Sequence, residues 1–209
     1  MLETLEPNDR ILGRRELLGT IASVALGAGT AVAGGSSRVA AQSSGSKVLV
    51  VYFTRTGNTR VIAQLIRRTL RADLFEIEPA APYPEDYEMT VSQAQKERDS
   101  SYQPALAAAV PDIGAYEVVF LGFPIWGETI PPVVRSFLAQ HDLTGKTIVP
   151  FITHGGYGQG RSMSTVRQLA PRARILDPFV MEADQERRTM TQVSNWLSKV
   201  NIRTSRTSS

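Results

Sequence analysis

The sequence of 209 residues contains no cysteine and only two histidines, His141 and His154. Absence of cysteine excludes a disulfide scaffold, a thiolate zinc site, an iron–sulfur cluster and a cysteine nucleophile. Two histidines cannot by themselves form a histidine-rich metal site, and we expect no metal. The excess of one charge over the other is also small, because 23 basic and 20 acidic side chains leave a net charge of +3. The basic residues are scattered along the chain, so we expect no nucleic-acid partner.

What is present is an ordinary globular composition, with 42% hydrophobic and 21% charged residues. That composition argues against wholesale disorder and against a fibrous architecture. The length suits one domain of ordinary size together with an appendage.

The first 41 residues differ from the rest and resemble a twin-arginine export signal. Arg14 and Arg15 precede two leucines and a weakly apolar run, rich in glycine and alanine, from Leu17 to Ala33. Small-residue cleavage sites end at Ala33 and Ala41. An uncleaved anchor is the alternative, but the apolar run has 17 residues with polar interruptions, which is short for a bilayer span. The resemblance predicts export of a folded protein to the periplasm or another extracytoplasmic location, with no stable membrane span after processing.

The rest of the sequence predicts one domain with short polar ends. Residues 42–46, Gln-Ser-Ser-Gly-Ser, are typical of a flexible joint. Residues 47–200 carry the periodic pattern of a folded domain, and residues 201–209 are predicted to be a disordered tail.

Five short apolar runs predict strands, and helical periodicity follows most of them. The runs are Lys47–Phe53, Leu74–Ile77, Glu117–Gly122, Thr147–Ile152 and Arg174–Leu176. The longer ones are almost unbroken and rich in β-branched residues, as in strands buried on both faces. Residues 79–111 interrupt the alternation, and there we expect a loop with a short surface helix at Glu85–Arg98. Strands alternating with helices predict a doubly wound α/β fold, in which a five-stranded parallel sheet lies between two helical layers.

Three loops that follow predicted strands carry the candidate binding residues, since ligands of such sheets bind beyond the carboxyl ends of the strands. The first loop runs Thr54-Arg55-Thr56-Gly57-Asn58-Thr59. Its hydroxyls and amides meet at a helix N-terminus and suit a phosphate without any lysine. An ordinary capped turn is the alternative. The loop matches neither the ATP/GTP phosphate loop nor the dinucleotide fingerprint.

The second and third loops combine aromatic rings with glycine. The backbone of glycine approaches a flat ligand more closely than that of other residues, and an aromatic ring stacks on such a ligand. The second loop contains Pro124, Ile125, Trp126 and Gly127, and the third contains Thr153, His154, Gly155, Gly156 and Tyr157.

Four phrases, in this order, resemble the flavodoxins and the bacterial flavodoxin-like family. They are Val-Tyr-Phe-Thr-Arg-Thr-Gly-Asn-Thr, Tyr-Pro-Glu-Asp-Tyr, Phe-Leu-Gly-Phe-Pro-Ile-Trp and Phe-Ile-Thr-His-Gly-Gly. The resemblance covers residues 47–200 and implies strand order 2-1-3-4-5 with bound FMN. It implies that the FMN phosphate binds to Thr54–Thr59. It also implies that the isoalloxazine ring lies against Pro124–Gly127 and Thr153–Tyr157.

Two features depart from the family pattern. Well-studied flavodoxins are strongly acidic, whereas this chain carries a net charge of +3. Gly127 stands where the family commonly has a second bulky aromatic residue, which leaves the ring more open on one face. His154 either contacts the flavin or accepts backbone hydrogen bonds within its own loop.

The resemblance implies an FMN-binding protein that transfers electrons outside the cytoplasm to a redox partner protein or a small quinone-like acceptor. An FMN-dependent NAD(P)H:quinone-type oxidoreductase is the alternative, with residues 79–111 as a wall of its substrate site. A flavin-free binding module on the same fold is an alternative of another class, although the intact Thr54–Thr59 loop argues against it. The residues leave the choice between carrier and reductase open.

Overall fold

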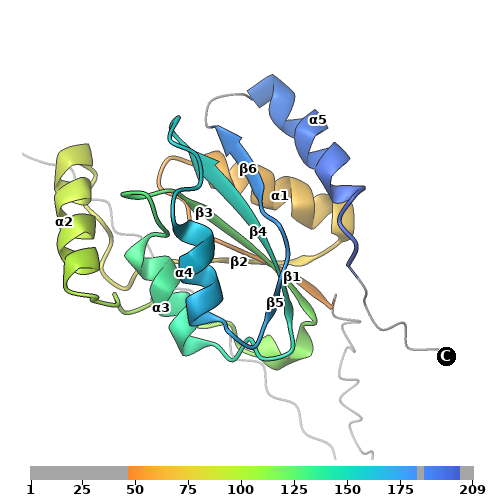
Figure 1. The fold of residues 1–209 in the computed structure, drawn as a ribbon, viewed down its shortest axis with the longest axis horizontal. Coiled ribbons are helices and arrows are strands. Elements are labelled where there is room, and N and C mark those ends of the chain that lie inside the picture. Colours follow the sequence, from red (N-terminus) through yellow and green to blue (C-terminus); the bar gives the residue numbers. More distant parts are fainter. Residues whose placement is uncertain (1–46, 183–185, 203–209) are drawn as a thin grey trace, which may run out of the picture. The chain divides into compact units, whose positions relative to one another are not determined.

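A parallel β-sheet flanked by helices forms the domain in the computed structural model, which describes residues 47–182 and 186–202 (Figure 1). The predicted export signal (1–41), the predicted joint (42–46) and residues 203–209 of the predicted tail lie outside the described residues. The strands are β1 Val48–Tyr52, β2 Asp73–Glu76, β3 Val118–Pro124, β4 Thr147–His154, β5 Arg174–Ile175 and β6 Phe179–Glu182. The helices are α1 Asn58–Leu70, α2 Tyr87–Asp99, α3 Pro132–Gln140, α4 Ser162–Leu169 and α5 Glu186–Leu197, with a 3-10 turn at Ile113–Ala115.

The sheet has the order β2-β1-β3-β4-β5, which confirms the predicted doubly wound arrangement. All strand pairs are parallel, and the register aligns Val50 of β1 with Phe120 of β3, and Phe120 with Val149 of β4. The chain passes from β1 to β2 on one side and then returns to place β3 on the other side of β1. The order therefore reverses next to β1, where sheets of this type bind ligands.

The edge of the sheet beside β4 contains one strand more than the sequence predicted. The expected strand Arg174–Leu176 is β5, and a further strand, β6, pairs with the carboxyl-terminal half of β4. Between the two, residues 176–178 lie opposite only Val149 and Pro150. Pro150 and Pro178 have no backbone N–H to donate, so the ladder is interrupted there and resumes one residue out of register.

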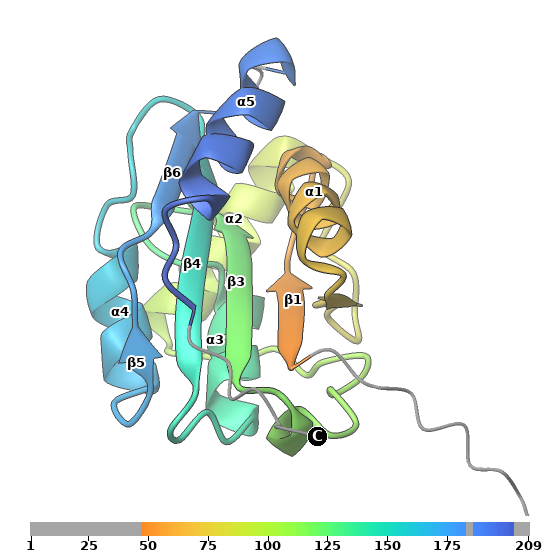
Figure 2. The same cartoon turned by 90° about the vertical axis from the view of Figure 1, so that its right-hand side faces the viewer.

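Helices α1 and α5 cover one face of the sheet, and α3 and α4 cover the other (Figure 2). An apolar core lies on each face. Alternate residues of β1 supply both: Leu49 and Val51 pack into the core with α3 and α4, while Val48 and Val50 pack into the core with α1. This follows from the period of two in a strand and explains why the strand sequences are apolar throughout. Ile202, which the sequence assigned to the tail, packs partly buried against the second core.

Helix α2 lies in the long connection between β2 and β3, and backbone contacts join the two ends of that connection. Pro79 forms an antiparallel bridge with Leu106, and the Ala80 N–H donates to the Ala105 carbonyl at 2.8 Å. Asp86 caps the helix by accepting from the Met89 N–H, as acidic N-cap residues do. The predicted surface helix is therefore present, and Figure 1 shows it beside the loops at one end of the sheet.

Candidate functional site

The loop after β1 forms an open anion cradle at the start of α1. Gly57 is the N-cap residue with φ +95°, and no side chain of the described residues caps the helix. The first intrahelical bond runs from the Val61 N–H to the Gly57 carbonyl at 3.2 Å. The preceding amides of Asn58, Thr59 and Arg60 therefore have no intrahelical acceptor, and the helix dipole adds partial positive charge there. No acidic residue lies in the first turn to oppose an anion.

Side chains of the same loop hold its shape. The Thr54 hydroxyl accepts from the Gly57 N–H at 3.0 Å, which closes the turn. Thr59 is buried and its hydroxyl lies 2.9 Å from the hydroxyl of Thr153, at the end of β4. Thr56 is exposed. The loop is thus tied to the neighbouring strand by Thr59, while Thr56 is left exposed.

The loop after β3 is a tight two-residue hairpin at Gly127 and Glu128. Trp126 and Thr129 exchange both backbone hydrogen bonds, at 3.0 and 3.3 Å. Gly127 has φ +55° and Glu128 φ +64°, the pattern of a type I′ turn. Glycine adopts that conformation freely, whereas a residue with a side chain loses roughly 1–2 kcal/mol in it. Glu128 is therefore held in a strained conformation at the tip of the turn.

Contacts from distant parts of the chain fix this hairpin. The Arg161 N–H donates to the Glu128 carbonyl at 2.7 Å. A side chain at Gly160, which has φ +51°, would collide with the backbone of Glu128. On the other side, the indole of Trp126 packs edge-on against Phe53 and Tyr83, with ring centroids 5.2 and 5.0 Å apart. The hairpin is thus built by tertiary packing.

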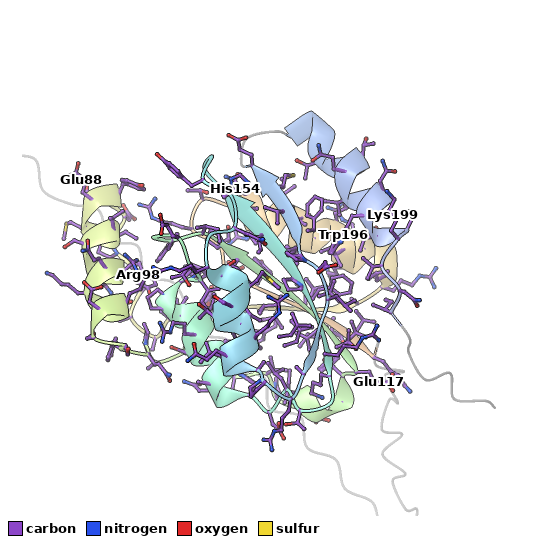
Figure 3. All side chains as sticks on the ribbon, viewed as in Figure 1. Glu88, Arg98, Glu117, His154, Trp196 and Lys199 are labelled. Atoms are coloured by element: carbon purple, nitrogen blue, oxygen red, sulfur yellow. The ribbon has the colours of Figure 1, made fainter. Side chains whose placement is uncertain are left out.

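The loop after β4 is organised around His154 (Figure 3). The His154 Nδ1 accepts from the N–H groups of Gly156 and Gly158, at 3.0 and 3.2 Å. Of the two roles expected for His154, the structure shows backbone capping. Tyr157, expected to cover the ligand ring, is 91% exposed.

A cavity of about 460 Å³ lies between these loops and α2. Its lining from the predicted site comprises Arg55, Ile125, Trp126, Gly127, Gly155 and Tyr157. Its lining from α2 comprises Tyr87, Thr90, Val91, Ala94 and Arg98, and Glu128 completes it. A second cavity of about 390 Å³ shares Arg55 and Trp126 with the first and extends past Thr54 toward the end of β2. Together, the walls of the two cavities include Thr54 and Arg55 of the loop after β1 and Trp126 of the hairpin after β3.

Two guanidinium groups reach the larger cavity and differ in their partners. Arg55 donates to the Glu85 carbonyl at 2.6 Å and lies over the Tyr87 ring, 5.6 Å from its centroid. It therefore links the loop after β1 to the start of α2. Arg98 lies against Gly127, because a Cβ built on that glycine would meet the guanidinium at 2.5 Å. Figure 3 shows Arg98 on the side of α2 that faces the sheet.

Carboxylates beside the cavities occupy defined positions. Glu76 accepts from Tyr52 at 2.6 Å and from Arg60 at 2.7 Å, so the Arg60 guanidinium is already neutralised. Burial, followed by the hydrogen bond to Glu76, raises the pKa of Tyr52. Glu97 is buried and accepts from the Tyr83 hydroxyl at 2.8 Å. Burial and this carboxylate raise the pKa of Tyr83 well above its usual value, so Tyr83 stays a neutral donor behind Trp126.

The structure brings most of the predicted binding residues to the carboxyl-terminal end of the sheet, because the parallel strands β1, β3 and β4 all end there (Figure 2). Thr153 is turned inward to Thr59, and Pro124 continues β3 beside it. The sequence offered residues 79–111 as a wall only for the reductase alternative, and it did not identify the individual α2 residues that line the cavity. Their spacing was a usable signal, because positions 87, 91, 94 and 98 share one helix face. The helix is too polar for its apolar periodicity to mark that face.

Residues 47–182 and 186–202 contain neither a candidate metal site nor a candidate membrane span. No group of three or more histidine, aspartate or glutamate residues in that part of the chain lies close enough to hold a metal ion. None of the helices described there is both long and apolar enough to cross a bilayer.

Solved structures with the same fold include several flavoproteins. A protein from Bacteroides eggerthii, described as a flavoprotein, is 31% identical with a TM-score of 0.66, over 76% of this chain and 99% of that one. One from Bacteroides uniformis is 27% identical, also with a TM-score of 0.66, over 74% of this chain and 99% of that one. A flavoprotein from Lactobacillus acidophilus, in complex with FMN, is 18% identical with a TM-score of 0.57, over 70% of this chain and 99% of that one.

Among curated proteins, none matches this sequence significantly. A family model described as flavodoxin matches residues 47–200, which include β1 to α5 and every residue of the candidate site. On that match, together with the Bacteroides eggerthii structure, the chain belongs to the flavodoxin family.

Proposed function

We propose that this protein binds one FMN and transfers electrons through it. The observation that carries the proposal is the uncapped start of α1 behind the Thr54–Thr59 loop. Free amides, a helix dipole and the exposed Thr56 hydroxyl form a donor set that fits a phosphate dianion. The FMN-bound Lactobacillus acidophilus flavoprotein, which shares the fold, adds support.

The larger cavity suits the ring of the same cofactor. It adjoins the Thr54–Thr59 loop through Arg55 and has Trp126 in its wall. Ile125 adds an apolar contact, and Val91 and Ala94 line the α2 side of the cavity, so that water is excluded from a flat ligand. When bound, FMN would supply the redox chemistry, and the protein would set its binding, orientation and electrostatic surroundings.

The Gly127 hairpin provides a movable carbonyl in this cavity. If the Gly127–Glu128 peptide turns over, the type I′ turn becomes type II′, which needs a positive φ only at its first central residue. Gly127 accepts that conformation and Glu128 is released from its strained φ of +64°. The bonds to Thr129 and Arg161 hold the ends of the hairpin and need not break. We infer that the Gly127 carbonyl turns toward the ring to accept a hydrogen bond when a ring nitrogen is protonated.

Two kinds of electron-transfer partner fit this site. A carrier that exchanges electrons with another protein remains our first proposal, because the exposed Tyr87 and Tyr157 border the cavity. A reductase with a small quinone-like acceptor and NAD(P)H as donor is the second, and the wall that α2 forms favours it. Reduction by NADH or NADPH alone separates the two, since a reductase is reduced rapidly and a carrier slowly.

The phosphate assignment is tested by comparing FMN with riboflavin, which lacks the phosphate. The full-length protein is freed of flavin and titrated with each, as wild type and as Thr56→Ala. Loss of a hydrogen bond to a charged group should weaken FMN binding about 10- to 100-fold and leave riboflavin nearly unchanged. Thr191→Ala, on the exposed side of α5, is the control and should change neither affinity. Equal weakening of both flavins by Thr56→Ala would place the phosphate elsewhere.

We further propose that residues 1–41 direct export of the folded protein through the twin-arginine route. Arg14 and Arg15 before a weakly apolar run support this. A noncovalent cofactor is most simply inserted before export, which gives a reason for a route that carries folded proteins. Replacing Arg14 and Arg15 together by lysine should retain the precursor in the cytoplasm. Undiminished export of that double variant would refute the proposal.

A further inference from the structure

Arg98 lies in the wall of the larger cavity and its guanidinium pairs with no residue of the described ranges 47–182 and 186–202. Its side chain is half-buried and lies against Gly127. No hydrogen bond or ion pair of its guanidinium to another residue occurs in the described part of the chain. A charge that is partly withdrawn from water and lacks a counter-charge is costly. An anionic ligand at this position would remove that cost.

The surroundings of Arg98 favour an anion over a cation. Arg55 adds a second positive charge to the cavity wall, although one of its nitrogens donates to the Glu85 carbonyl and its guanidinium lies over the Tyr87 ring. The only carboxylate in the lining is that of Glu128, which is exposed and therefore screened by solvent. The half-buried Arg98 is screened less, so positive potential dominates inside the cavity.

The remaining walls select a flat and largely apolar ligand. Val91 and Ala94 line the α2 side and the Trp126 indole lines the opposite side. Tyr87 and Tyr157, 69% and 91% exposed, border the cavity where a ligand enters from solvent. A planar guanidinium also matches a carboxylate in geometry, because both oxygens can accept at once.

We propose that the cavity beside α2 also binds a small aromatic carboxylate, with the carboxylate paired to Arg98 and the aromatic ring on the α2 side of the cavity, between Val91 and Ala94 and the flavin ring that lies against Trp126. In this proposal the second kind of partner named above, a small-molecule acceptor, carries an acidic group. The redox role of this ligand rests on the proposed FMN site, which lies in the same cavity. The binding step itself requires only the residues described above and is measurable without flavin.

The probe is 2-naphthoate, with 2-naphthamide as its neutral isostere. Each is titrated into the FMN-loaded full-length protein while the visible absorption of the flavin is recorded. Naphthoate should shift the flavin band saturably and bind about 10- to 100-fold more tightly than naphthamide, the range for a hydrogen bond to a charged group. Arg98→Gln should remove that preference and Arg98→Lys should restore part of it. Lys96→Gln, which removes an exposed charge from the same turn of α2, is the matched control and should bind as wild type.

Three results would overturn the inference. One is equal affinity for naphthoate and naphthamide in the wild type. Another is an Arg98→Gln variant that retains the preference. The third is a wild-type protein that binds no carboxylate, together with an Arg98→Gln variant whose flavin has a shifted reduction potential. The partner of Arg98 would then be the flavin itself.

Failure of the FMN proposal would be seen separately. If the protein takes up no FMN, the same titrations are read from indole fluorescence in a Trp196→Phe background, in which Trp126 is the remaining tryptophan. A naphthoate preference that depends on Arg98 would then uphold the anion site without the flavin. Absence of that preference would refute the anion site on its own.

Discussion

The loop after β1 and the hairpin after β3 lie at the same edge of the sheet but are built in different ways. The first is six consecutive residues whose turn is closed internally, by Thr54 and the Gly57 amide. The second is four residues held by Arg161, Gly160, Arg98 and two aromatic rings from elsewhere in the chain. The comparison teaches that a binding element encoded locally can be recognised in sequence. One assembled by packing depends on residues that lie far away in the sequence.

The largest expected effect comes from Gly160, whose contact fixes the hairpin. Gly160→Ala places a methyl group against the backbone of Glu128 at a positive φ. We expect a loss of about 2–5 kcal/mol in the free energy of unfolding from overpacking and strain together, because backbone cannot move aside as a side chain can. Urea denaturation measures it.

Gly158→Ala is the matched control for this change. Gly158 also has a positive φ, +70°, but its Cβ would meet nothing within 4 Å. The control should lose only the strain of roughly 1–2 kcal/mol. Equal losses in the two variants would show that the Glu128 contact does not hold the hairpin.

An intermediate effect is expected at the contact that ties the loop after β1 to β4. Thr59→Val leaves the buried hydroxyl of Thr153 without its partner, at a cost of about 1–3 kcal/mol. Replacing both threonines by valine removes both polar groups and should be less destabilising than the sum of the single changes. Additive effects in a double-mutant cycle of unfolding free energies would mean that the two hydroxyls do not interact.

The smallest expected effect is a pH dependence of the unfolding free energy, which arises from Tyr83 behind Trp126. The pKa of Tyr83 is raised in the folded protein from its ordinary 10.0 by burial and by Glu97. At a pH above that value the unfolded chain loses the proton while the folded protein keeps it, so stability falls as pH rises from about 10. The contribution is fully present below that pH. Tyr83→Phe should flatten the fall in unfolding free energy between about pH 9 and 11, and an unchanged slope would contradict the assignment.

The same comparison explains what could be predicted from the sequence. The alternation of strands and helices follows from unbroken apolar runs, and the Thr54–Thr59 loop follows from a contiguous motif. The strand order was implied by the resemblance to the flavodoxins, and the structure has that order. The break between β5 and β6 was missed because it depends on which residues of the edge segment lie opposite Pro150 of β4, and the sequence alone does not show that pairing. A wall from residues 79–111 was expected only for the reductase alternative. Its individual residues were not identified, because Arg98 is recognisable as a site residue only once α2 has packed beside Gly127. Tyr157 was expected to cover a ring, but no contact in the described structure draws it inward.

A crystal structure of the full-length protein loaded with FMN tests the central claim most directly. The account predicts one FMN per chain, with the phosphate within hydrogen-bond distance of the Asn58 and Thr59 amides. It also predicts the ring in the cavity between α2 and Trp126. A phosphate bound to Arg98, or a ring that lies outside that cavity, would contradict the account.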